Sequence, residues 1–103
     1  MTDKELLELA AKAAGMDVCC VSSDGVHSYD TEVVWNPLTY YCDALRLAVK
    51  LHMTVRCYMG TTCVQIGVPG QANAYVEETN YDDPAVATSR AIVRAAAKIG
   101  GDK

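Results

Sequence analysis

The side chains with intrinsic chemical reactivity are few and follow no catalytic pattern. The chain has five cysteines and two histidines, His27 and His52, and no two cysteines have the Cys-x-x-Cys spacing of zinc and thioredoxin sites. Neither histidine has a companion at metal-ligand or triad spacing, and His52 is interpreted as a helix-terminal or partly buried residue. A thiol enzyme would need Cys42 or Cys57 beside His52 in the fold. The pattern favours free thiols packed as small apolar side chains, and it predicts no metal, no cofactor and no enzyme.

Tyrosines and carboxylates give a stronger signal, which is for binding. There are six tyrosines and no phenylalanine in 103 residues, and tyrosine suits interfaces because it buries area while it keeps a polar group. Because Tyr40 and Tyr41 are adjacent, they cannot point the same way, and at least one is expected at the surface. The acidic segment 77–83 offers contacts to a basic partner. The predicted partner-binding residues are Tyr40, Tyr41, Glu78, Tyr81, Asp82 and Asp83. The alternative is that the tyrosines fill the core margin and the acidic segment is a solvated loop.

The charge balance argues against one class of partner. The net charge is −4 at pH 7, whereas non-specific nucleic-acid binding depends on clustered Lys and Arg. Direct binding to nucleic acid is therefore not expected. A small nucleotide signal stays open as a ligand, and it would need a pocket lined by basic residues. The arginines considered for such a pocket are Arg46, Arg56, Arg90 and Arg94.

Length and hydropathy predict a single domain over residues 1–103 in the cytoplasm. A chain of 103 residues can bury enough surface to fold without metals or disulfides. No apolar run approaches the roughly 20 residues that a membrane span needs. The first five residues, Met1–Glu5, lack the basic and then apolar layout of a signal peptide.

Three segments carry helix signals. The first runs over 3–14, with Thr2 capping the amide of Glu5 and Gly15 at its end. The last follows Asp83, which is a good N-cap before a proline, and Gly100–Gly101 is expected to end it.

The middle helix, over 41–52, follows the Asn36–Pro37 turn. Leu45 and Val49 share one face with His52, and two more leucines widen the apolar sector. This helix is therefore predicted to be packed over more than half of its circumference.

Runs of β-forming residues separated by turn residues predict strands on both sides of the middle helix. The predicted runs are 16–21, 26–35 as one bent strand or two, 54–59, 62–68 and 72–77. Short turns between neighbouring runs indicate hairpins. The expected fold is α+β: a mainly antiparallel sheet of four to five strands packed with three helices, in an α/β/α-like sandwich.

Four stretches together resemble a known protein family. They are 1–15, Trp35–Leu38, Asp43–Leu51 and Ala91–Ala97. The chain is similar over nearly its whole length to small phage and prophage proteins with the phage ABA-sandwich domain. This resemblance implies a sheet layered between helices, a cytosolic setting in an infected bacterium and no established catalytic activity. The chain departs from the family at 39–42, Thr-Tyr-Tyr-Cys, where the family is acidic and glycine-containing.

The leading hypothesis is a non-enzymatic phage protein that blocks a host protein or complex. Its sharpest form is an inhibitor of a host defence system, such as an anti-CRISPR protein. Two alternatives are a binder of a small nucleotide signal and a structural, self-associating phage protein. A homodimer is also considered.

Overall fold

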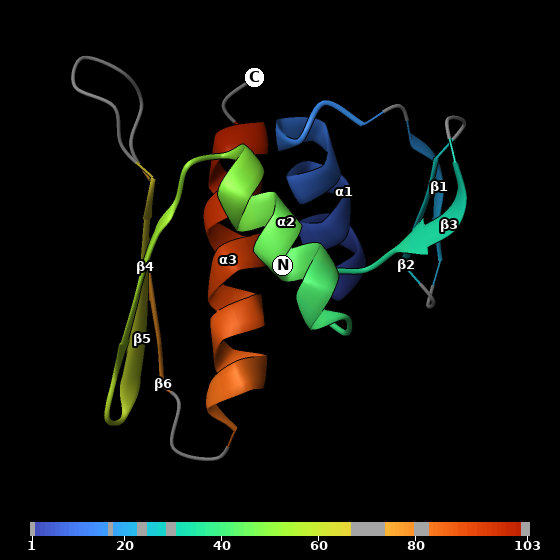
Figure 1. Ribbon diagram of the computed structural model, residues 1–103. Helices are drawn as coiled ribbons and strands as arrows, with labels where there is room; N and C mark the ends of the chain where they lie inside the picture. Colours follow the sequence, from blue (N-terminus) through green and yellow to red (C-terminus); the bar gives the residue numbers. More distant parts are fainter. Residues whose placement is uncertain are drawn as a thin grey trace.

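The computed structural model describes residues 2–16, 18–22, 25–28, 31–66, 74–79 and 83–101. These residues form three helices and two three-stranded sheets (Figure 1). The helices are α1 (Asp3–Ala13), α2 (Tyr41–Lys50) and α3 (Pro84–Gly101). Sheet A consists of β1 (Val18–Ser22), β2 (Gly25–Ser28) and β3 (Thr31–Trp35). Sheet B consists of β4 (Thr54–Tyr58), β5 (Thr61–Ile66) and β6 (Ala74–Thr79). All four strand pairings are antiparallel.

The helices lie between the two sheets, with sheet B on one side and sheet A on the other (Figure 1). Helix α1 explains this arrangement because it is buried on two faces. Leu6 and Ala10 belong to the core shared with α3 and sheet B, whereas Leu7 and Ala11 pack against Val26 of sheet A. The α+β class is confirmed. The predicted sandwich with one sheet of four to five strands is not, because the strands form two separate sheets, of which sheet A packs against α1 and sheet B packs against α3.

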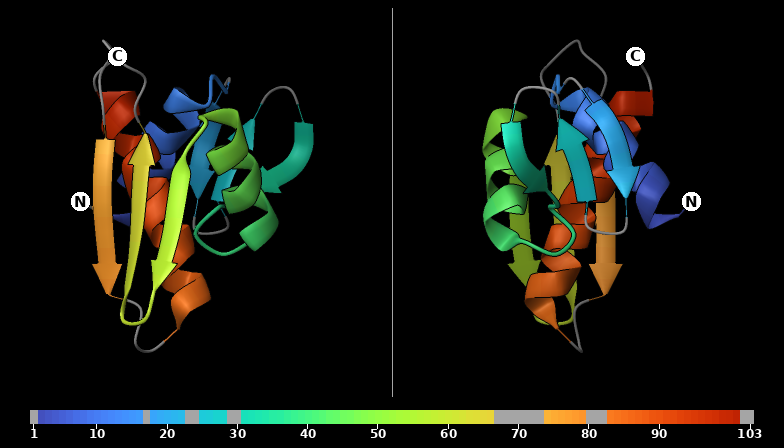
Figure 2. Two further views of the ribbon diagram at one scale, coloured as in Figure 1. Left: turned by 60° about the vertical axis from the view of Figure 1, so that its left-hand side comes forward. Right: turned by 90° about the vertical axis from the view of Figure 1, so that its right-hand side faces the viewer.

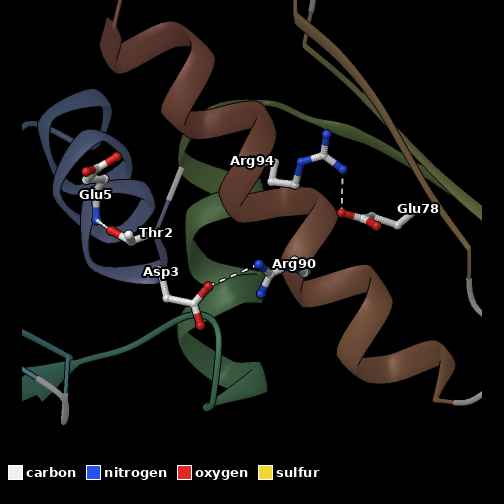
Figure 3. Close-up of polar contacts among 6 residues, drawn as sticks. All are labelled: Thr2, Asp3, Glu5, Glu78, Arg90 and Arg94. Carbon is white, nitrogen blue, oxygen red and sulfur yellow. Dashed lines mark hydrogen bonds and ion pairs between the residues drawn. The ribbon is translucent and has the colours of Figure 1, made fainter.

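The ends of α1 follow the sequence signals. The Thr2 hydroxyl accepts a hydrogen bond from the Glu5 amide at 3.2 Å (Figure 3), as the cap prediction requires. At the other end Gly15 has a φ of 75°, and the Met16 amide donates to the Ala11 carbonyl at 3.0 Å. This geometry ends the helix and returns the chain, and glycine adopts it without a steric penalty.

Helix α3 packs most extensively against α1 and also covers β5 and β6. Small residues make the close approach possible, and at Gly100 no larger residue fits, because an added Cβ would clash with the Leu9 carbonyl oxygen. Helix α3 ends at Gly101, within the predicted Gly100–Gly101 pair, although both glycines still belong to the helix. Gly100 is also required for the contact between the two helices.

Strand β4 is an outer strand of sheet B and is left largely uncovered by α3. Its hairpin partner is β5, with Tyr58 opposite Thr61 and Val55 opposite Val64. Val64 is buried under α3, but all five residues of β4 are exposed. Figure 2 (left) shows β4 at the edge of the sheet, with α2 beside it. Within the described part of the chain, no helix has the length and apolar character to cross a membrane.

Candidate functional site

A buried turn sets the start of α2, where the predicted tyrosine contacts lie. The Asn36 Oδ1 atom accepts hydrogen bonds from the amides of Leu38 at 3.1 Å and Thr39 at 3.3 Å. The Asn36 carbonyl accepts from the Tyr40 amide at 2.8 Å. Asp43, in the first turn of α2, accepts from the Asn36 amide at 3.0 Å. The turn and the first helical turn therefore hold each other in place, as side-chain caps do elsewhere.

This turn presents Tyr40 and Tyr41 at the surface, with exposed fractions of 56% and 51%. The prediction that at least one of the two is exposed is confirmed, and both are. They border an open hollow of about 590 Å³, here called the entrance hollow. Its lining residues are Val34, Thr39, Tyr40, Tyr41, Cys42 and Asp43. Two rigid aromatic rings, a carboxylate and an aliphatic wall are a combination suited to contact with another protein.

A second hollow, of about 460 Å³, opens between α2 and β4 above the side of α3. We call it the α2–β4 groove. The described side chains that line it are Tyr41, Ala44, Leu45, Ala48, Val55, Cys57, Pro84, Ala85, Thr88, Ser89 and Ile92. None of these is charged, and most are apolar. Sequence reasoning missed this groove, because it joins residues from three distant segments.

The groove corrects the packing predicted for α2. The helix buries Ala44, Leu47 and Ala48, but Leu45 and Val49 are 65% and 67% exposed. The prediction that α2 is packed over more than half of its circumference is therefore wrong. The reason is that α2 contacts α3 along one side, while the space between its next face and β4 is left open. The wide apolar sector of α2 was the available sequence signal, but only the structure shows which part of that sector is left uncovered.

The other predicted contact residues divide between two places. Asp83 caps α3, because its Oδ1 accepts from the amides of Ala85 at 3.1 Å and Val86 at 3.2 Å. Ala85 lines the groove together with Tyr41, so the structure brings Asp83 to the same end of the molecule as the tyrosines. Glu78 lies on β6, at the opposite edge of sheet B. Tyr81 and Asp82 lie outside the described residues.

Glu78 and two of the arginines are engaged in ion pairs. Figure 3 shows Arg94 of α3 directed at Glu78, and Arg90 directed at Asp3 with an N–O distance of 3.0 Å. The carboxylate of Glu78 therefore has an intramolecular partner. None of the four arginines considered for a nucleotide pocket lines the entrance hollow or the groove.

The histidines have local structural contacts. His52 follows α2 with a φ of 54°, and the next amide, of Met53, donates to the Ala48 carbonyl at 2.9 Å. Its interpretation as a helix-terminal residue is confirmed. The His27 ring is 3.0 Å from the Ser22 hydroxyl across β1 and β2. Among the described residues, no three His, Cys, Asp or Glu side chains gather as a metal site would require.

Comparisons with protein-family models, with curated proteins and with solved structures gave no match for this chain. The resemblance to the phage ABA-sandwich family therefore stays a prediction, and the site is interpreted from its own geometry.

Proposed function

We propose that this protein is a non-enzymatic binding protein that occupies a host protein or complex through the end of the molecule around Tyr40 and Tyr41. The observation that carries the proposal is the pair of exposed tyrosines over the entrance hollow, held by the buried Asn36 turn. Tyrosine side chains have few rotatable bonds and the turn holds their backbone, so they lose little conformational freedom on binding and contribute strongly to affinity. Asp83, at the same end, adds a carboxylate for a basic group of the partner.

The sharper form of the proposal is a phage protein that acts in the host cytoplasm against a defence system, as an anti-CRISPR protein does. It is supported by the resemblance of the sequence to small phage proteins and by the lack of a recognisable catalytic motif. Blocking by occupation requires a stable surface and no chemistry. The alternative of a nucleotide-signal binder has no favouring observation, since Arg90 and Arg94 are already paired with carboxylates.

The test is capture of the tagged chain from a lysate of the bacterium that carries the phage or prophage, followed by reconstitution with the purified partner. We expect one host complex to bind at a fixed stoichiometry. The double variant Tyr40→Ala/Tyr41→Ala should reduce affinity at least about tenfold, because paired aromatic anchors dominate such interfaces.

Tyr75→Ala is the matched control. Tyr75 is also exposed, but it lies on β6, where its hydroxyl donates to Glu77 at 2.7 Å. The pKa of the Tyr75 phenol is raised, mainly by a side-chain hydrogen bond with Cys63 and next by the one with Glu77. Equal loss of binding in the control and the double variant, or none in the double variant, would place the partner on another surface.

A further inference from the structure

We propose that the α2–β4 groove and the free edge of β4 together form a docking surface for a second copy of this chain, which makes the protein a two-fold symmetric dimer. This surface shares Tyr41 with the tyrosine contact of the proposed function, but it stands on separate observations. They are an edge of β4 that no described strand pairs, the exposed side chains of Leu45 and Val49 on α2 beside it, and the lack of charge among the described residues that line the groove.

The edge of β4 carries backbone groups that no described strand pairs. Tyr58 and Thr61 flank the two-residue turn at Met59–Gly60, and in such a hairpin the flanking residues form a hydrogen-bonded pair. Bonding to β5 then alternates, so the amides and carbonyls of Val55 and Cys57 face outward. An antiparallel second β4 offers the same donors and acceptors, which makes the edge self-complementary.

Side chains on the groove side of β4 continue this edge into an apolar surface. Val55 is opposite the buried Val64, so it points to the helix side of the sheet, yet it is 37% exposed. Tyr41 and Leu45 of α2 line the same groove, and Val49 follows one turn later. Antiparallel pairing of the two β4 strands joins sheet B of one copy to sheet B of the other in one continuous sheet. The exposed apolar residues of α2 from both copies then lie on the same side of that sheet.

The area matches what a dimer of this kind needs. Scaled by their exposure, the side chains of Tyr41, Leu45, Val49, Val55 and Cys57 offer on the order of 500 Å² of accessible surface per copy. A standard interface buries about 800 Å² on each partner, and about 65% of a homodimer interface is apolar. The apolar share required is therefore also roughly 500 Å², and the strand backbone and the rim supply the remainder.

Charge explains why a second copy can dock here. Two copies with a net charge of −4 each repel one another in general. None of the described side chains that line the groove is charged, so contact between them brings no like charges together. Arg56 lies between Val55 and Cys57 on the other face of β4. A two-fold axis at Val55 or Cys57 avoids two arginines directly opposite one another, which would be destabilising.

Sedimentation equilibrium of the full chain over a wide concentration range tests the proposal. We expect a reversible equilibrium between the 11.1 kDa chain and a species of twice that mass. Leu45→Glu should raise the dissociation constant at least about tenfold, because it buries a charge in the apolar contact. Val55→Pro should do the same by removing an outward amide, a substitution that an edge strand tolerates.

Gln65→Glu is the matched control. It introduces the same charge at an exposed position of the central strand β5 and should leave the dimer unchanged. Circular dichroism of each variant separates loss of dimer from loss of fold, and Leu45→Glu keeps the test valid if Val55→Pro does not fold. A monomer at all concentrations, open-ended assembly, or a dimer that resists Leu45→Glu would each overturn the proposal.

Discussion

The two edges of sheet B differ in how they are protected. At β6, α3 lies over the strand, Arg94 pairs with Glu78, and Lys98 donates to the Tyr75 carbonyl at 3.0 Å. Charged side chains and a helix are two of the usual means by which proteins block unwanted strand pairing. At β4 the described residues provide neither a covering helix nor an ion pair, and the adjoining groove is uncharged. The difference supports the proposal that a second copy pairs at β4 and not at β6.

The largest expected effect lies in the contact between α1 and α3, the helix that covers β6. Gly100→Ala should lower the free energy of unfolding by about 2–4 kcal/mol, because the new methyl group clashes with the Leu9 carbonyl and forces α3 away from α1. Gly101→Ala is the control, since nothing lies within 4 Å of its added Cβ. Urea denaturation of both variants measures the difference, and equal midpoints would contradict the close contact.

The next largest loss of stability is expected at the turn before α2, near the β4 edge. Asn36→Ala should cost about 1–3 kcal/mol, because it leaves the part-buried Leu38 amide without its side-chain acceptor and removes one of the two acceptors of the Thr39 amide. Thr39→Ala, at an exposed position of the same turn, should change stability by less than about 0.5 kcal/mol. The same denaturation experiment checks this. If the two variants are equally stable, the side chain of Asn36 does not hold the turn.

A substitution at His52, between α2 and β4, should stabilise the protein. His52→Gly should raise the free energy of unfolding by about 1 kcal/mol, because the φ of 54° is strained for any residue with a Cβ. His52→Ala retains the strain and should show no comparable gain. Thermal and urea unfolding of this pair separate the backbone effect from loss of the imidazole, and a gain in both variants would contradict the strain argument.

The smallest effect concerns the ion pairs of α3. Glu78→Gln should cost roughly 0.5–1 kcal/mol, and Asp3→Asn less than about 0.5 kcal/mol. The reason is solvent screening: the Glu78 side chain is 21% exposed, whereas that of Asp3 is 63% exposed. Both losses should shrink as salt is added, and the smaller one first. If Asp3→Asn lowers stability more than Glu78→Gln does, the ion pair between Arg94 and Glu78 does not help to protect the β6 edge.

The sequence by itself determined the local features. Thr2, Gly15 and the Asp83–Pro84 pair marked helix ends correctly because capping depends on hydrogen bonds and φ angles within a few residues. The hairpin of β4 and β5 and the α+β class followed from the alternation of residues and from turn chemistry. The exposure of at least one of Tyr40 and Tyr41 also followed, since adjacent side chains cannot share one direction, whereas the exposure of both is known only from the structure. Their role in binding a partner stays a prediction.

Only the tertiary structure decided which apolar faces are covered. Leu45 and Leu47 are the same residue type two positions apart in α2, yet one is 65% exposed and the other is buried. The sequence could not separate them, because burial depends on where α3 and β4 lie relative to α2. The same holds for Gly100, whose neighbour Leu9 is distant in the chain. Local rules fix the elements, and long-range packing fixes the free surface at which this protein is proposed to associate.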